Sequence, residues 1–187
     1  MLPWRGGLAG TVSAMTEQTA GQPDPEITAL LNCLTGQRKH VLGILDGLDE
    51  EDLRRPVLPS GWSCLGLVRH LALDVERFWF GAVLAGDPAV IAALDDETDA
   101  WLVDPAVPAA EVLDGYRREI SLADAIITAT PASTAPAWWP TDLFGEQDVH
   151  SHREILLHVI AETACHSGHL DAVRELIDGH RWLVMTD

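Results

Sequence analysis

The residues with the clearest potential for chemistry lie near the C-terminus, in the segment HREILLHVIAETACHSGHLDAVRELIDG. Imidazole nitrogens and carboxylate oxygens bind divalent metal ions, and two such residues spaced i, i+4 on a helix can reach one ion, as Glu162 and His166 would. On a helix that turns about 100° per residue, four potential ligands share a stripe about 80° wide: His158, Glu162, His166 and His169. The segment therefore predicts a metal site.

The charged residues of the same segment indicate which side of the helix faces solvent. By the same arithmetic they fall roughly between 160° and 260° from His158: Arg153, Asp171, Arg174, Glu175 and Asp178. The stripe is therefore expected on the core side of the helix. An isolated ionised carboxylate is costly to bury, so Glu162 needs a compensating partner there. A divalent cation would supply that compensation.

A third ligand is expected from a facing helix, and the segment GWSCLGLVRHLALDVERFWF offers His70. On a helical projection His70 shares a face with Leu71 and Phe78, while Arg69 and Glu76 project to the far side. His70, Glu162 and His166 together would give three protein ligands. That number leaves zinc a fourth position open for water or substrate, which is typical of catalytic sites.

Four further polar residues lie near the candidate ligands in the predicted helices. His169, His158 and Asp74 are expected to orient the ligands through hydrogen bonds, because ligands are usually held by such partners. Asp74 could instead begin the solvated edge of its helix. Cys165 could be a reactive thiol or an extra ligand, but a small buried hydrophobe is the more frequent role of a lone cysteine.

Three tryptophans are candidates for a substrate-binding wall. Trp138 and Trp139 lie in a proline-rich, aromatic loop and could line a pocket for an apolar substrate or plug one end of the fold. Trp62 directly precedes the second helix, where it could line a pocket or act as a hydrophobic staple.

The elements that must position these residues are helices. Apolar residues recur at i, i+3, i+4 and i+7 in four segments separated by Pro, Gly and Asp clusters: Glu26 to about Leu48, Cys64 to about Ala85, Pro108 to just before Pro131, and Ser151 to Asp178. Sustained period-two alternation, the signature of strands, does not occur. The sequence predicts an all-α, single-domain, antiparallel or crossover four-helix bundle, a fold whose core recurrently holds metal sites.

The amino-acid composition excludes some classes of binding partner. The 187 residues carry 29 Asp and Glu against 12 Lys and Arg, a formal charge of −17, so neither nucleic acid nor an anionic membrane is an expected partner. No apolar run is long enough to span a bilayer. The three cysteines form no disulfide framework, which favours a reducing cytoplasm.

The N-terminus is expected to lie outside the fold. Residues 1–14 contain a weakly apolar stretch that falls short of a secretory signal, and Met15 is a second plausible start. We expect residues 1–25 to form a disordered extension and residues 26–187 to form the bundle domain.

The second and last helices together resemble the DinB-like superfamily of four-helix-bundle metalloproteins. The motifs GWSxxxLVRHL and ExxxHxGHxDxxRExIDG carry the resemblance, which extends over about residues 26–180. The superfamily includes mycothiol-dependent maleylpyruvate isomerase and the bacillithiol transferases. On the isomerase pattern, His70, Glu162 and His166 match the His, Glu and His metal ligands, whereas other branches use His at all three places.

The resemblance implies a divalent metal, zinc first and nickel second, that binds a low-molecular-weight thiol such as mycothiol at an open end of the bundle. A divalent cation lowers the pKa of a bound thiol, and the thiolate is the nucleophile. The implied activity is that of a thiol transferase or isomerase in which this thiol attacks a small electrophile.

Two other functions share the same sequence features. A metal-dependent hydrolase would keep the site but place water in the open position. A non-enzymatic, metal-binding homodimer would act by association, and seven tryptophans are compatible with an interface. A di-iron bundle is disfavoured because it expects two Glu-x-x-His motifs, whereas Glu154 and Glu162 belong to Glu-x-x-x-His.

Overall fold

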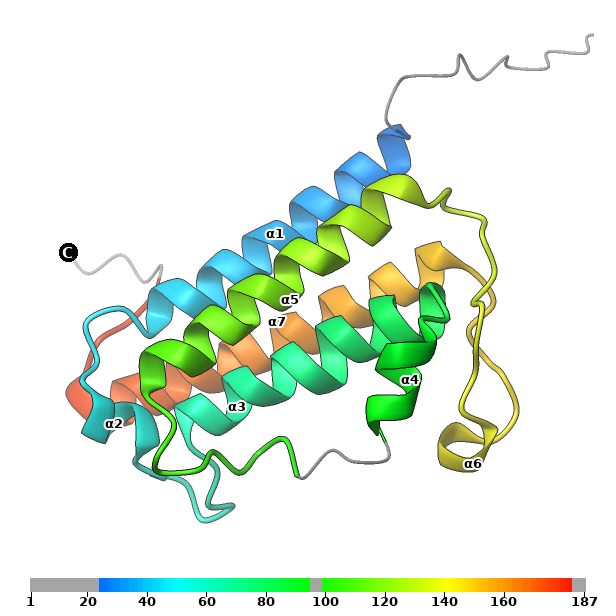
Figure 1. Cartoon of the computed structure of the whole chain (residues 1–187). Coiled ribbons are helices and arrows are strands. Elements are labelled where there is room, and N and C mark those ends of the chain that lie inside the picture. The colour runs from blue at the N-terminus through cyan, green and yellow to red at the C-terminus, as the bar shows by residue number, and fades with distance from the viewer. Residues whose placement is uncertain (1–23, 95–98, 183–187) are drawn as a thin grey trace, which may run out of the picture.

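Helices make up all the regular secondary structure in residues 24–94 and 99–182, the part of the chain that the computed structural model describes (Figure 1). The all-α prediction is thereby confirmed. The long elements are α1 (Pro25–Ile44), α3 (Cys64–His70) with its continuation η1 (Leu71–Leu84), α5 (Ala109–Ala129) and α7 (His152–Asp178). Three short helices that the sequence analysis did not predict lie in the connections: α2 (Glu50–Arg54), α4 (Pro88–Leu94) and α6 (Thr141–Phe144).

The ends of the long helices follow from local side-chain chemistry. Ser63 caps α3 by accepting a hydrogen bond from the backbone N–H of Gly66, and Ser151 caps α7 in the same way through Glu154. Gly179, with φ 80°, ends α7 in the left-handed conformation that glycine adopts without strain. The first helix ends at Ile44, earlier than expected from its apolar pattern, because the chain turns over the following three residues.

The expected N-terminal extension lies almost entirely outside the described residues. Only its last two residues, Asp24 and Pro25, are described, and they belong to α1: Pro25 is its first residue, and the Asp24 carboxylate accepts a hydrogen bond from the N–H of Glu26 at 2.9 Å. The helix therefore begins one residue earlier than predicted. Proline fits the first helical position because its missing N–H would have no intrahelical partner there.

The four long elements form a bundle in which α1 contacts α7 and α5, and η1 contacts α5 and α7. Figure 1 shows that α1 and α7 run in one direction while α3, η1 and α5 run in the other. Because η1 and α5 are neighbours with the same direction, the chain between them, which includes α4, must return along the length of the bundle. The bundle is thus of the crossover type.

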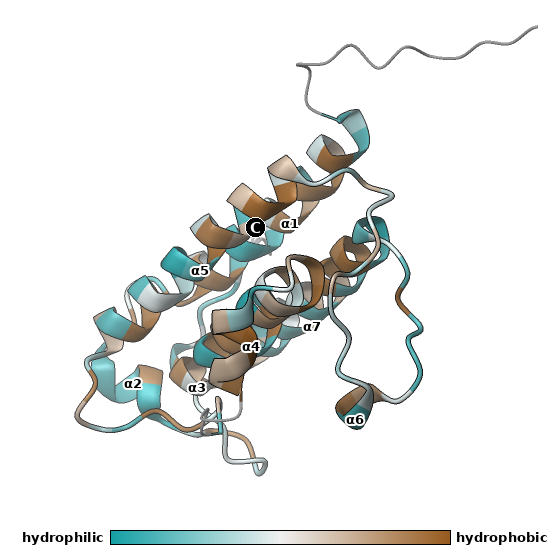
Figure 2. Cartoon of the chain, turned by 45° about the vertical axis from the view of Figure 1, so that its right-hand side comes forward, coloured by the Kyte–Doolittle hydropathy of each residue, from teal (hydrophilic) through white to brown (hydrophobic). Residues whose placement is uncertain are grey.

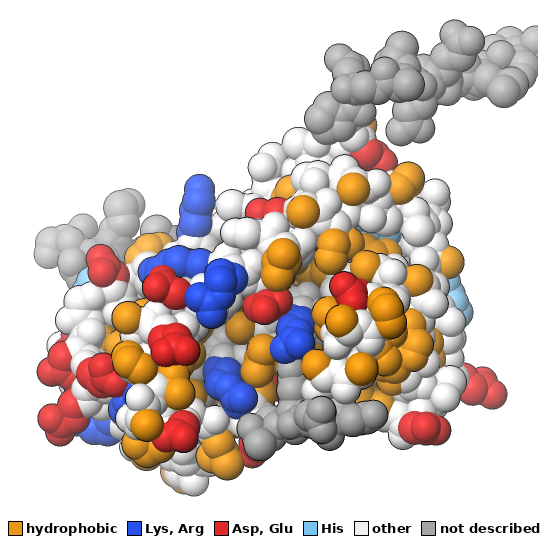
Figure 3. All heavy atoms as spheres, in the orientation of Figure 1, with side chains coloured by type: hydrophobic (Ala, Val, Ile, Leu, Met, Phe, Trp, Pro, Cys, Tyr) orange, Lys and Arg blue, Asp and Glu red, His pale blue; other side chains and the backbone are white. Residues whose placement is uncertain are grey.

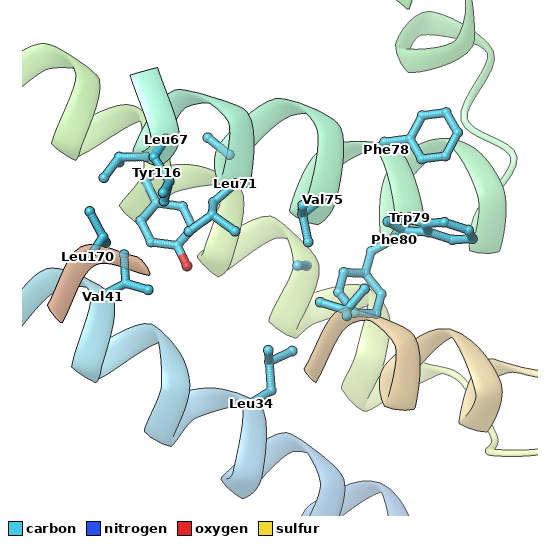
Figure 4. Close-up of a cluster of buried hydrophobic side chains, with 14 of the residues drawn as sticks. Leu34, Val41, Leu67, Leu71, Val75, Phe78, Trp79, Phe80, Tyr116 and Leu170 are labelled. Carbon is cyan, nitrogen blue, oxygen red and sulfur yellow. The ribbon is translucent and has the colours of Figure 1, made fainter. Parts of the chain in front are cut away.

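A hydrophobic core fills the space between the long helices. Each helix carries hydrophobic and hydrophilic residues on different parts of its surface (Figure 2), and every long element contributes fully buried side chains. Figure 4 shows Leu34 of α1, Leu67 of α3, Tyr116 of α5 and Leu170 of α7 directed into this core. None of the described helices combines the length and hydropathy needed to cross a lipid bilayer.

A buried ion pair interrupts the apolar core. The guanidinium of Arg38 in α1 donates two hydrogen bonds of 2.6 Å to the carboxylate of Glu76 in η1, and a third of 2.7 Å to Asp124 of α5. Glu76 is only 1% exposed, so the expectation that it faces solvent is wrong. The element η1 is a π-helix that continues α3 and packs against α4, α5 and α7, so little of its surface faces solvent. Burial raises the pKa of the Glu76 carboxyl, and the hydrogen bonds from Arg38 oppose that shift.

Arg174 of α7 is also buried, contrary to the prediction that it marks the solvent side of its helix. Its guanidinium donates to the carbonyl oxygens of Ile44 and Asp46 at 2.6 and 2.8 Å, and it pairs with Asp178 one turn further along α7. The carbonyl groups at the end of a helix lack intrahelical donors, and Arg174 satisfies one of them at the end of α1. A long arginine side chain can therefore lie on the core side of a helix.

Candidate metal centre

Three side chains that could bind one metal ion meet where α7 packs against the junction of α3 and η1. His70 is the last residue of α3, and Glu162 and His166 lie one turn apart in the middle of α7. One ligand atom from each lies within 4.8 Å of the others. The shortest separations are 3.1 Å between Nε2 of His166 and Oε1 of Glu162, and 3.9 Å between Nε2 of His70 and the same oxygen. The structure thus brings the three predicted ligands together.

The tautomer of His70 follows from its hydrogen bond to Asp74. Nδ1 of His70 lies 2.8 Å from Oδ2 of Asp74, and because a carboxylate only accepts, the proton is on Nδ1. In the neutral imidazole, which is the form that binds metal, Nε2 then carries a lone pair. That atom is buried and has no hydrogen-bond partner among the described residues. A buried lone pair directed at a carboxylate and a second imidazole fits a bound cation.

The second imidazole is also kept in the form that binds metal. Burial lowers the pKa of His166, and the nearby His70 ring lowers it further, while Glu162 acts in the opposite direction. Neutral imidazole, not imidazolium, is a metal ligand. His166 is therefore available as a ligand at neutral pH.

Glu162 does not lie in the core, as the sequence analysis expected. Its side chain is 38% exposed, against 14% for His70 and 12% for His166. The core side of α7 is centred on residues such as Val159, Thr163 and Leu170, and the predicted stripe lies along the edge of that side. Compensation for a buried charge therefore does not require a metal at Glu162. The support for a metal site is instead that the three ligand atoms lie close together. The exposure of Glu162 leaves the site open to solvent on one side.

The crossover connection covers the other side of the site with a tryptophan that the sequence analysis missed. The indole of Trp101 stacks on the His70 ring, with 4.3 Å between ring centroids and 18° between planes. Arg69 holds this connection in place by donating to the carbonyl oxygens of Asp99 and Leu102. The carbonyl of Trp101 also approaches Gly66 so closely that a Cβ there would lie 2.3 Å from it. A tryptophan in a non-helical connection has no periodic signal that would have revealed this role.

Of the three residues expected to support the ligands, Asp74 and His169 lie next to a candidate ligand, and His158 packs elsewhere. Asp74 contacts His70 directly, as described above, and Nδ1 of His169 lies 3.4 Å from Nδ1 of His166. His158 packs against Trp79 instead, with 4.3 Å between ring centroids. The side chain of Cys165 is exposed, so the interpretation of this residue as a small buried hydrophobe is wrong.

The tryptophans proposed for substrate binding occupy two places. Trp62 lies beside the site, with its ring centroid 6.4 Å from that of His169 and 6.3 Å from that of Trp101. Trp138 and Trp139 line a cavity next to Asp74, together with Phe78 and residues of α4 and α6. Trp62 is therefore next to the site, whereas Trp138 and Trp139 share a cavity with Asp74, the hydrogen-bond partner of His70.

Comparison with known proteins adds an independent finding. A family model described as mycothiol-S-transferase matches residues 29–179, a range that includes all three ligand residues and every long helix almost completely. A search of curated proteins found no match.

Proposed function

Because this chain belongs to the mycothiol-S-transferase family, within the DinB-like superfamily, we propose that it uses a divalent metal ion to join a low-molecular-weight thiol, through its sulfur, to a small electrophile. The observation that carries the proposal is the unpartnered Nε2 of His70, which faces Glu162 and His166 in a site open to solvent. Zinc is the first candidate for the metal and nickel the second.

His70, Glu162 and His166 would hold the ion. When bound, a divalent cation lowers the pKa of a thiol that coordinates it, so that the thiolate forms near neutral pH. A single anionic ligand leaves such a site with a net charge of about +1, which favours an anionic sulfur over a neutral one. The exposure of Glu162 provides the side from which a thiol can enter.

The remaining residues of the site position these groups. Asp74 fixes the ring of His70 by accepting its Nδ1 proton, and Trp101 covers one face of that ring. In the transfer, a carbon–sulfur bond forms and the bond from that carbon to its leaving group breaks, with the electron pair going to the leaving group. The thiol proton is released to solvent.

The thiol dependence of turnover tests this function. We expect zinc-loaded protein to accelerate the reaction of mycothiol with the electrophile monochlorobimane, and the Glu162→Gln variant to lose that acceleration. The matched control is Glu175→Gln, which removes an exposed carboxylate from the same helix.

The same assay separates the transferase from a hydrolase. A hydrolase would consume an ester electrophile without added thiol, because metal-bound water supplies its nucleophile. Consumption that is independent of thiol but sensitive to Glu162→Gln would replace the transferase proposal with the hydrolase.

A further inference from the structure

A cavity of about 690 Å³ lies beside the metal centre, between η1, α4 and the segment that leads into α6. Its volume falls within the range of small-molecule binding sites, about 300–1,000 Å³. One residue joins the cavity to the site: Asp74 lines the cavity and also accepts the hydrogen bond from His70. A molecule in the cavity would therefore lie one side chain away from the metal ligands.

The aromatic side of the cavity is held in place by several contacts. Phe78 and Trp138 meet edge to face, with 6.3 Å between ring centroids. The backbone N–H of Trp138 donates to the carbonyl of Val83 in η1, and the indole N–H of Trp139 donates to the carbonyl of Gly145. These bonds fix the rings before any ligand arrives, which reduces the entropy lost on binding.

The charged groups of the cavity are all acidic. Asp74, Asp99 and Asp142 line it, and no Lys, Arg or His is among its described lining residues. Arg69 reaches the backbone carbonyl of Asp99 and not its carboxylate, which instead accepts a hydrogen bond from the N–H of Trp101. On the face seen in Figure 3, the basic side chains lie toward the left and centre, away from α6 at the lower right of Figure 1.

From this combination we propose that the cavity binds the electrophilic substrate, and that this substrate carries a cationic group attached to an apolar body. The identification as the electrophile's site rests on the proposed transferase function. Aromatic faces attract cations through their quadrupole, and carboxylates around a low-dielectric wall add a negative potential. A dicarboxylate such as maleylpyruvate would meet like charge from all three aspartates, so it is not the expected substrate.

Binding of small charged probes tests the proposal without catalysis. We expect benzyltrimethylammonium to quench the tryptophan fluorescence saturably and to bind at least about tenfold more tightly than benzenesulfonate, with benzyl alcohol intermediate. Calorimetry provides a second measurement of the same affinities. Absence of saturable binding by the cation, or equal or tighter binding of the anion, would overturn the proposal.

Two variants locate the binding. Asp142→Asn should weaken binding of the cation about two- to fivefold and leave benzyl alcohol unaffected, and Trp138→Leu should weaken both. Asp148→Asn is the matched control, because Asp148 is an exposed acid of the same segment that does not line the cavity. Cation binding that is unchanged in both Asp142→Asn and Trp138→Leu would show that the cavity is not the site.

The titrations are made with metal-loaded protein and with protein stripped by a chelator, in both cases without thiol. Failure of cation binding would then leave the metal and thiol proposal standing. Loss of thiol transfer, in turn, would leave the ligand class of the cavity intact.

Discussion

Oδ2 of Asp74 lies 2.8 Å from Nδ1 of His70, and this contact determines which ring nitrogen of His70 faces Glu162 and His166 in the candidate metal centre. The two residues are one turn apart across the junction of α3 and η1, so the helix itself sets their separation. A carboxylate that accepts the outer N–H of a metal-binding histidine fixes the ring and raises the basicity of the other nitrogen. In this chain the same carboxylate also lines the neighbouring cavity.

Removal of this carboxylate should weaken metal binding without abolishing it. We expect Asp74→Ala to lower zinc affinity about 10- to 100-fold, because His70 would lose the partner that orients its ring. Competition with a chromophoric chelator measures the affinity. Asp114→Ala removes an exposed carboxylate of α5 and should change nothing, and an unchanged affinity in Asp74→Ala would show that Asp74 has no part in the site.

The contact between Gly66 and Trp101 predicts opposite effects for two Gly→Ala substitutions. Gly168→Ala, in the exposed middle of α7 with nothing within 4 Å of the new Cβ, should stabilise the protein by about 0.5–1 kcal/mol. Gly66→Ala should destabilise it by about 1–3 kcal/mol, because the new Cβ would displace the backbone of Trp101.

Thermal unfolding compares the two variants, and zinc titration adds a specific readout. If Trp101 covers His70 as the structure shows, Gly66→Ala should weaken zinc binding as well as stability. A Gly66→Ala protein that is more stable than wild type would contradict the observed approach of the two segments.

The buried pair of Arg38 and Glu76 should be strongly coupled. We expect Arg38→Met to lower the free energy of unfolding by about 3–5 kcal/mol, because it leaves the buried Glu76 carboxylate without its partner. Glu76→Leu should lower it less, because Arg38 keeps its ion pair with Asp124. The double variant should recover much of that loss, since the remaining partner Asp124 is 41% exposed and can be solvated.

Urea denaturation of the four proteins of this double-mutant cycle measures the coupling. The exposed pair of Asp114 and Arg117 is the control cycle, with an expected coupling of about 1 kcal/mol or less. Additive losses in the Arg38 and Glu76 cycle would contradict the ion pair.

His152 should make stability depend on pH. This side chain is fully buried at the first turn of α7, and burial lowers its pKa from the usual value of 6.5. The native state then holds it neutral while the unfolded chain takes up a proton as the pH falls through about 6.5. Its stabilising contribution is therefore fully present above that pH and is lost below it, by up to about 1.4 kcal/mol per pH unit.

Thermal unfolding from about pH 7.5 to about pH 5.5 tests this dependence. We expect His152→Gln to show a shallower loss of stability in acid than wild type, and His150→Gln, which alters an exposed histidine, to behave like wild type. Identical pH profiles for wild type and His152→Gln would contradict a buried neutral imidazole.

The sequence was sufficient to predict the four long helices, and it selected three residues, His70, Glu162 and His166, that the structure places together. The predicted limits of α7, Ser151 and Asp178, agree with the structure, in which Ser151 caps the helix and Gly179 ends it. The i, i+4 spacing of Glu162 and His166 placed them on one side of this helix. The match of His70 required the family motif, since a single histidine on a helix carries little information.

The burial of individual side chains could not be predicted from spacing in the same way. Arg174 was taken to mark solvent, but its long side chain reaches the carbonyl groups at the end of α1, and this error rotated the expected core side toward Glu162. Glu76 was misplaced because its partner, Arg38, comes from a distant part of the chain. His152 is buried as well, although it lies outside the stripe of candidate ligands on α7. Such pairings across helices leave no periodic trace in the sequence.

Metal content is the most direct test of the central claim, that His70, Glu162 and His166 bind one divalent ion. The protein should be purified without a metal-binding tag, supplied with zinc or nickel, desalted and measured by mass spectrometry. We predict about one equivalent of metal in wild type and in Glu175→Gln, and less than about a tenth of an equivalent in Glu162→Gln. Wild-type protein that retains less than about a tenth of an equivalent after either metal is supplied would contradict the account.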